Sequence, residues 1–85
     1  MGKRIAVIAI IIDDLTAAEA VNDILHEASD YIIGRMGIPY RSAGVNIISV
    51  AVDAPETVIN ALSGKLGQVE HVSSKTAYSN VITEG

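Results

Sequence analysis

The run Ile5 to Ile12 (Ile-Ala-Val-Ile-Ala-Ile-Ile-Ile) restricts the possible folds more than any other stretch of this sequence. Successive side chains of a β-strand point to opposite faces, and both sets are apolar here, which is typical of a central strand covered on both sides. Asp13-Asp14 follows the run directly, and its eight residues are far too few to span a bilayer. The sequence therefore predicts a buried central strand, in preference to a secretory signal peptide that begins at Lys3 and Arg4.

The first predicted helix begins after this run, where Thr16 and Glu19 form a capping-box pattern. Polar residues of the helix, including Asn22, are expected on its outer face. The apolar residues that recur at the spacing of one helix face are Ala18, Val21, Ile24, Leu25 and Ala28.

The second predicted helix begins near Asp53, the expected N-cap, with Pro55 in the first turn, where its missing amide proton is harmless. Gly67 is the expected stop. Glycine inside a helix costs about 1 kcal/mol relative to alanine, so we expect Gly64 to pack closely against the sheet. The expected buried stripe consists of Val58, Ile59, Leu62 and Leu66.

Three further strands are expected, over Tyr31 to Gly37, Val45 to Val52 and Val69 to Tyr78. The stretch Ile38 to Gly44 is expected to be a loop, since Pro39 cannot donate to a β-ladder and Gly44 permits a positive φ. Residues 1–78 then form a single domain, and residues 79–85 form a loose tail.

The order strand, helix, strand, strand, helix, strand predicts an α+β fold, the ferredoxin-like βαββαβ sandwich. Right-handed crossovers place both helices on one face of a four-stranded antiparallel sheet. The other face inherits one side of Ile5 to Ile12 and one side of Val45 to Val52, an apolar patch larger than a soluble monomer usually exposes. We therefore expect a homo-oligomer, a dimer or tetramer built on sheet-to-sheet or edge-to-edge contacts.

Charge and composition exclude several classes of function. The net charge of -4 disfavours direct binding of nucleic acid, and the predicted sheet lacks the aromatic residues on which RNA bases stack. The absence of cysteine excludes disulfides, thiolate nucleophiles, cysteine-ligated zinc and iron–sulfur clusters. We expect a cytoplasmic protein without a cofactor, a metal site or a membrane segment.

The sequence contains only parts of the motifs that bind phosphate, bind metal ions or catalyse a reaction. Ser63-Gly64-Lys65 resembles part of a phosphate-binding loop, but it ends a predicted helix instead of opening one. His26 and His71 lie on different predicted elements, without the three or four converging ligands that a metal requires. Because no nucleophile and base pair can be assembled, we do not expect an enzyme.

Two groups of residues are candidates for ligand binding. Asp13 and Asp14 can act as paired carboxylates or bind a cation, although acids are expected before a helix N-terminus on electrostatic grounds alone. The second group consists of three cations and a phenol on the predicted hairpin and a nearby strand, which can gather around a small anion or an acidic partner; these residues are Arg35, Tyr40, Arg41 and Lys75. The alternative for this second group is a solvated hairpin.

Several stretches resemble a small bacterial family, the iron-only hydrogenase system regulators. They are Arg35-Met36-Gly37-Ile38-Pro39-Tyr40-Arg41, Ile47-Ile48-Ser49-Val50, Ala61-Leu62-Ser63-Gly64-Lys65-Leu66-Gly67 and Val72-Ser73-Ser74-Lys75-Thr76. The resemblance extends from Lys3 to Ala77 and implies an ACT-like ferredoxin fold, similar to the C-terminal sensory domain of the nickel-responsive repressor. The nickel ligands of that repressor have no counterparts on the hairpin strands, where Arg35, Ile48 and Val50 stand, and its DNA-reading ribbon-helix-helix segment has no counterpart either.

The resemblance implies a regulatory module that neither binds nickel nor reads DNA directly. Our first hypothesis is an oligomeric ACT-like module that binds a small effector at a subunit interface, near the Asp13 to Leu15 turn or the Arg35 to Arg41 hairpin. The alternative is a structural or adaptor protein that binds a regulator or a maturation partner, without a small-molecule ligand. An acylphosphatase shares the fold, but Asp13 and Asp14 would repel a phosphate after the first strand.

Overall fold

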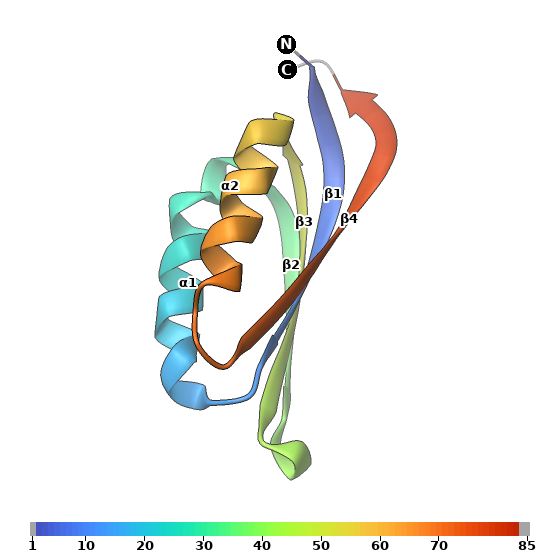
Figure 1. Cartoon of the computed structure of the whole chain (residues 1–85). Coiled ribbons are helices and arrows are strands. Elements are labelled where there is room, and N and C mark those ends of the chain that lie inside the picture. Colours follow the sequence, from blue (N-terminus) through green and yellow to red (C-terminus); the bar gives the residue numbers. More distant parts are fainter. Residues whose placement is uncertain (1, 84–85) are drawn as a thin grey trace.

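The secondary structure follows the predicted order in residues 2–83, the part of the chain that the computed structural model describes. Its main elements are β1 (Lys3–Ile12), α1 (Ala18–Glu27), β2 (Ile32–Tyr40), β3 (Val45–Ala54), α2 (Glu56–Gly67) and β4 (Val72–Thr83). The strands form one antiparallel sheet in the order β2-β3-β1-β4, and both helices lie on one face of it (Figure 1). The predicted α+β ferredoxin-like fold, with the ACT-like arrangement, is confirmed.

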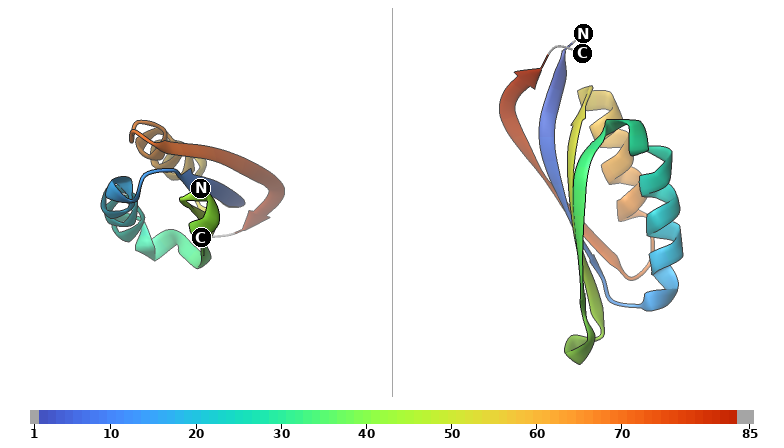
Figure 2. Two further views of the ribbon diagram at one scale, coloured as in Figure 1. Left: turned by 90° about the horizontal axis from the view of Figure 1, so that it is seen from below. Right: turned by 180° about the vertical axis from the view of Figure 1, so that it is seen from behind.

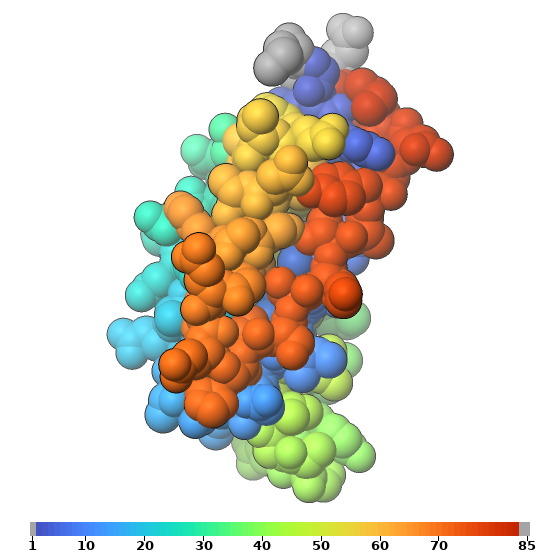
Figure 3. Space-filling view, viewed as in Figure 1, coloured from blue at the N-terminus to red at the C-terminus, as the bar shows by residue number. Residues whose placement is uncertain are grey.

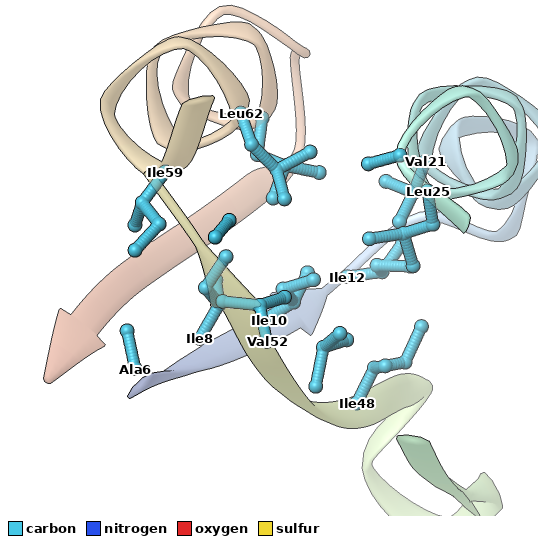
Figure 4. Close-up of a cluster of buried hydrophobic side chains, with 14 of the residues drawn as sticks. Ala6, Ile8, Ile10, Ile12, Val21, Leu25, Ile48, Val52, Ile59 and Leu62 are labelled. Carbon is cyan, nitrogen blue, oxygen red and sulfur yellow. The ribbon is translucent and has the colours of Figure 1, made fainter. Parts of the chain in front are cut away.

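The core lies between β1, β3 and the two helices. Alternate side chains of β1 turn toward the helices, so Ile8, Ile10 and Ile12 are fully buried. They meet Val50 and Val52 of the neighbouring strand β3 and apolar residues from both helices (Figure 4). The prediction of a central apolar strand is therefore confirmed, with helices covering one of its two faces.

Both predicted helix stripes are found in the core. In α1 the buried residues are Val21 and Leu25, with Ala28 buried just after the helix and Ala18 and Ile24 packed against the core. In α2 they are Ile59, Leu62 and Leu66, with Val58 partly buried. The 3.6-residue period located the inward face of each helix correctly.

The predicted helix caps are wrong. Asp14, not Thr16, caps the turn of 3₁₀ helix (Leu15–Ala17) that precedes α1, because its side chain accepts a hydrogen bond from the Thr16 backbone N–H. Asp53 belongs to β3 and accepts a hydrogen bond from the Thr83 hydroxyl, so Pro55 occupies the N-cap of α2.

The roles predicted for the two glycines of α2 differ from those observed. The helix does end at Gly67, but Gln68 provides its C-cap with an ordinary negative φ. A Cβ built at Gly64 would have no neighbour within 4 Å, so close packing against the sheet does not explain this glycine.

The hairpin between β2 and β3 is longer than predicted. Ile38, Pro39 and Tyr40 continue β2 instead of forming a loop, and the turn is the short 3₁₀ segment Arg41–Ala43. A proline is accommodated here because β2 is an edge strand. A residue without a backbone N–H group is tolerated there, since one side of the strand has no neighbour to bond. The positive φ predicted for Gly44 is confirmed at 69°.

The expected loose tail is part of β4 up to Thr83, while residues 84 and 85 lie outside the described residues. Arg4 holds this end of the strand. Its Nε donates to the Ser79 carbonyl at 2.7 Å, Nη1 pairs with Glu56 at 3.1 Å, and the guanidinium lies 5.0 Å from the ring centre of Tyr78. The register shift between Arg4 and Ala6 falls at the same place.

Within residues 2–83 no element covers the second face of the sheet. Seen from below, both helices lie on the same side of the strands (Figure 2). The register places Val7, Ile11 and Ile47 on the uncovered face, opposite to the buried residues of the same strands. We call the exposed apolar residues of this face the sheet-face patch; they are Val7, Ile11, Met36, Ile38, Tyr40 and Ile47.

The burial of β1 gives a first prediction. Truncating Ile10 to Ala should lower the free energy of unfolding by about 2 to 5 kcal/mol, because it removes buried contacts and leaves a cavity, while Ile10→Val should cost about 0.5 to 1.5 kcal/mol. Urea unfolding at one fixed protein concentration measures both. The control is Ile33→Ala. Because Ile33 is 63% exposed, this substitution should change the free energy of unfolding by no more than about 0.5 kcal/mol. Equal losses at the two positions would contradict the described core.

Candidate functional site

The six candidate residues occupy separate places in the fold. Asp13 and Asp14 follow β1, Arg35 lies on the helix side of β2, Arg41 lies in the hairpin turn, and Tyr40 and Lys75 lie on the uncovered sheet face. The structure therefore does not gather Arg35, Arg41 and Lys75 around one ligand within a single chain. Arg35 and Lys75 are separated by the thickness of the sheet.

The Asp13-Asp14 turn is joined to the loop before β4. His71 Nδ1 lies 3.2 Å from Asp13 Oδ1, and its Nε2 lies 3.8 Å from Asp14 Oδ2. The Asp13 backbone N–H donates to the His71 carbonyl at 2.9 Å. His71 also has a positive φ of 66°, an uncommon conformation for a residue other than glycine. This pairing was not predictable from the sequence, since 58 residues separate Asp13 from His71.

Hydrogen bonds also fix the Asp14 carboxylate. Thr16 donates to Asp14 Oδ1 from its backbone N–H at 3.0 Å and from its hydroxyl at 2.8 Å. These bonds hold the pKa of Asp14 below its ordinary value of 3.8, and His71 adds a smaller attraction in the same direction. Helix capping and the bond to His71 thus account for both acids. Across residues 2–83, no three His, Asp or Glu side chains are arranged to hold a metal ion.

Arg35 stands beside a hollow between α1 and the hairpin. Its Nη2 donates to Asn22 Oδ1 at 2.9 Å. Asn22, which was expected on the outer face of α1, is exposed but lies on the side of that helix next to β2. The hollow is about 260 Å³ in volume, and its lining includes Ile12, Ile48 and Asn46.

The hollow exists in part because Gly37 leaves the helix side of β2 without a side chain at this point. Gly37 pairs with Ile48 and lines the hollow, and nothing lies within 4 Å of a Cβ built on it. The hairpin also runs past the end of the helix layer, so α1 does not cover this part of the sheet (Figures 1 and 2). Sequence reasoning singled out Arg35 but missed Asn22 and Asn46, because only the folded hairpin brings them together.

The uncovered face is apolar with few charges. Lys75 pairs with Ala9 in the centre of this face, while Lys3 and Asp53 lie at one end of it. Eight of the nine acidic residues in the described part of the chain lie on the helices or their flanking turns. The negative charge of the protein is therefore concentrated away from the sheet-face patch.

The sequence pattern of the TM1266-like family, described as "Iron-only hydrogenase system regulator, putative", matches residues 4–76. The chain belongs to this family. The family match confirms the resemblance noted in the sequence and supports a regulatory role in the iron-only hydrogenase system.

Two solved structures show the same architecture. The uncharacterized protein TM1266 from Thermotoga maritima is 38% identical in sequence, and the similarity covers 89% of this chain and 96% of that one with a TM-score of 0.86. A formyltetrahydrofolate deformylase from Pseudomonas putida KT2440 is 14% identical over 91% of this chain and 29% of its own, with a TM-score of 0.65. The second likeness is one of fold alone. A search of curated proteins finds no match to this chain.

Within residues 2–83, no helix is both long enough and apolar enough to cross a membrane.

The bonds to Asp14 predict a pH-dependent contribution to stability. Because the pKa of Asp14 is lowered in the folded state, its stabilising effect should be complete above pH 3.8 and should be lost as the pH falls through the lowered value. Asp14→Ala should therefore lower the urea midpoint at pH 7, and the difference from the wild type should shrink below pH 3.8. Thr16→Val, which keeps the backbone donor, should show a smaller effect of the same sign. A difference that stays constant with pH would contradict this assignment.

Proposed function

We propose that this chain is a homo-oligomeric regulatory module of the iron-only hydrogenase system that binds a small effector at the margin of a subunit interface. The family match supports the regulatory role. The observation that carries the proposal is the construction of the β2–β3 hairpin, which presents Met36 and Tyr40 on one face and the hollow at Arg35 on the other. A partner chain and an effector would contact opposite faces of the same two strands.

The size of the uncovered face supports a second copy as its occupant. The six residues of the sheet-face patch lie on three adjacent strands and are 38% to 60% exposed, so they form one broad apolar surface. A second copy offers the same surface, which is what a two-fold interface requires. Apolar area of this extent is rarely left exposed by a soluble monomer.

The charge distribution also favours self-association through this face. Two copies stacked sheet to sheet bring together Ile11, Ile47 and Ile38, which lie side by side in adjacent strands. The acidic helices remain on the outside of such a pair, where water solvates them. A two-fold arrangement of this kind closes on itself.

The hairpin gives a physical route from effector to assembly. Where it passes the helix layer, the hairpin is a single layer of two strands (Figure 2), and its free end projects at the bottom of the space-filling view (Figure 3). A ligand that fixes the helix side of β2 fixes the opposite face of β2 as well, so its binding is linked to association of the chains. Regulation would then consist of a shift in the assembly equilibrium.

An adaptor role is the alternative, and the exposed sheet-face patch favours it, since the same surface fits a different protein. In either case we propose that the chain is cytoplasmic and neither catalyses a reaction nor binds DNA directly. The net charge of -4 supports the last point, because affinity for DNA depends on neutralising phosphates.

Assembly is tested by a charge placed on the sheet face. Ile11→Lys should convert the oligomer to a monomer in native mass spectrometry, because the interface would have to bury an unpaired ammonium group. Leu15→Lys is the matched control, since Leu15 is 67% exposed but lies in the turn before α1. A monomeric wild type would refute self-association, and a wild type that associates only with another protein would establish the adaptor role.

The regulatory role is tested in the organism that carries the protein. Deleting its gene should change the transcript level or activity of the iron-only hydrogenase, and the wild-type chain should restore both. The Ile11→Lys chain should fail to restore them and the Leu15→Lys chain should succeed, since only the first lacks the interface. An unchanged hydrogenase after deletion would argue against the proposed role.

A further inference from the structure

We propose that the hollow beside Arg35 binds a short aliphatic carboxylate, an inference that rests on the proposed effector site and specifies its ligand. Arg35 supplies the charge for this choice. A guanidinium has five N–H donors, and among the residues that the structure describes only the bond from Nη2 to Asn22 occupies one of them. Arg35 takes part in none of the ion pairs found within residues 2–83.

The lining of the hollow selects an apolar tail. Ile12 and Ile48 are buried beneath it, but Ile38 is 48% exposed, Pro39 is exposed and Ala18 is half-buried, and all three line the hollow. A ligand that extends from Arg35 along these side chains removes apolar surface from water, which is favourable in proportion to the area.

The hollow has one cation, which favours a monoanion. A phosphate monoester carries nearly two negative charges, yet Arg35 is the only charged residue that lines the hollow within residues 2–83, and the whole protein carries a net charge of -4. A carboxylate needs one guanidinium, with which it forms two parallel charge-assisted hydrogen bonds. Asn22 and Asn46 add neutral amide groups, which can bind a hydroxyl or carbonyl next to the carboxylate.

The volume limits the length of the ligand. If each non-hydrogen atom takes about the 30 Å³ that a water molecule occupies in the liquid, a hollow of about 260 Å³ has room for roughly nine such atoms. Two of these are the carboxylate oxygens, so roughly seven carbons lie inside the hollow. A ten-carbon chain would extend into solvent.

A second hollow adjoins Arg35 on its other side, and its lining includes Asp23, His26 and Ser29. Asp23 is the acid that competes for the guanidinium from this direction. Because no ion pair joins Asp23 and Arg35 in the described structure, an incoming carboxylate does not have to displace an internal one. It only has to share Arg35 with the amide of Asn22.

The test is an NMR titration of the ¹⁵N-labelled full chain with acetate, hexanoate, decanoate and 1-hexanol. Hexanoate should saturate, with shifts concentrated at Asn22, Asn46 and the residues of β2 around Gly37. Acetate and 1-hexanol should each bind at least tenfold more weakly, since one lacks the tail and the other the charge, and decanoate should gain nothing over hexanoate.

Two pairs of variants assign the site. Arg35→Gln should weaken hexanoate binding about tenfold to a hundredfold, whereas Arg41→Gln, which removes a cation from the hairpin turn, should leave it unchanged. Gly37→Val should block the hollow while keeping Arg35, because a side chain at Gly37 meets open space. Gly34→Val is its control, since Gly34 faces the opposite side of β2 and also meets no atom within 4 Å.

Equal binding of hexanoate by the wild type and Arg35→Gln would overturn the proposal, as would equal affinity for hexanoate and 1-hexanol or the absence of saturable carboxylate binding. Native mass spectra of the same samples separate this failure from failure of the proposed assembly. An oligomer that binds no carboxylate refutes the ligand class alone, and a monomer that binds hexanoate refutes the assembly alone.

Discussion

The fold depends on the burial of one side of β1 between β3, β4 and the helix layer. Ile8, Ile10 and Ile12 have no exposed surface, and the inward residues of α1 and α2 meet at the same layer. Hydrophobic burial is the dominant favourable term in folding, and this chain concentrates it in aliphatic side chains, since it has no phenylalanine or tryptophan. Both candidate surfaces are consequences of this arrangement. The sheet has one spare apolar face, and the hairpin extends beyond the helices that cover the other.

The structure separates two kinds of surface that the sequence places close together. Along β2, consecutive residues alternate between the hollow and the sheet-face patch, so Arg35 and Gly37 belong to one and Met36 and Ile38 chiefly to the other. Because successive side chains point to opposite faces, this nine-residue strand contributes to both the hollow and the sheet-face patch. It also means that changes at neighbouring positions should affect different properties of the protein.

Features with a strong period were predictable from the sequence, and features set by distant contacts were not. The apolar residues on both faces of β1 identify it as a central strand, and the apolar residues at helical spacing identify α1 and α2. The end of β4 was missed because Arg4 stabilises it from 75 residues away. The cap before α1 was misplaced because the Thr16 hydroxyl donates to Asp14 instead of accepting from the Glu19 amide, and the sequence does not show which of these two local hydrogen bonds forms. Arg35 was found as a charged residue, but its face depends on the irregular register between Ile32 and Gly34.

Pro39 has a consequence for how chains of this protein can associate. A β-strand at the edge of a sheet offers its free amide and carbonyl groups to any other strand, and repeated pairing of this kind leads to fibres without a defined end. Pro39 lies in β2, an edge strand, and has no N–H group to donate to an incoming strand. The proline thus interrupts the edge of the sheet beside its apolar face. Growth of the sheet through β2 from chain to chain is therefore disfavoured.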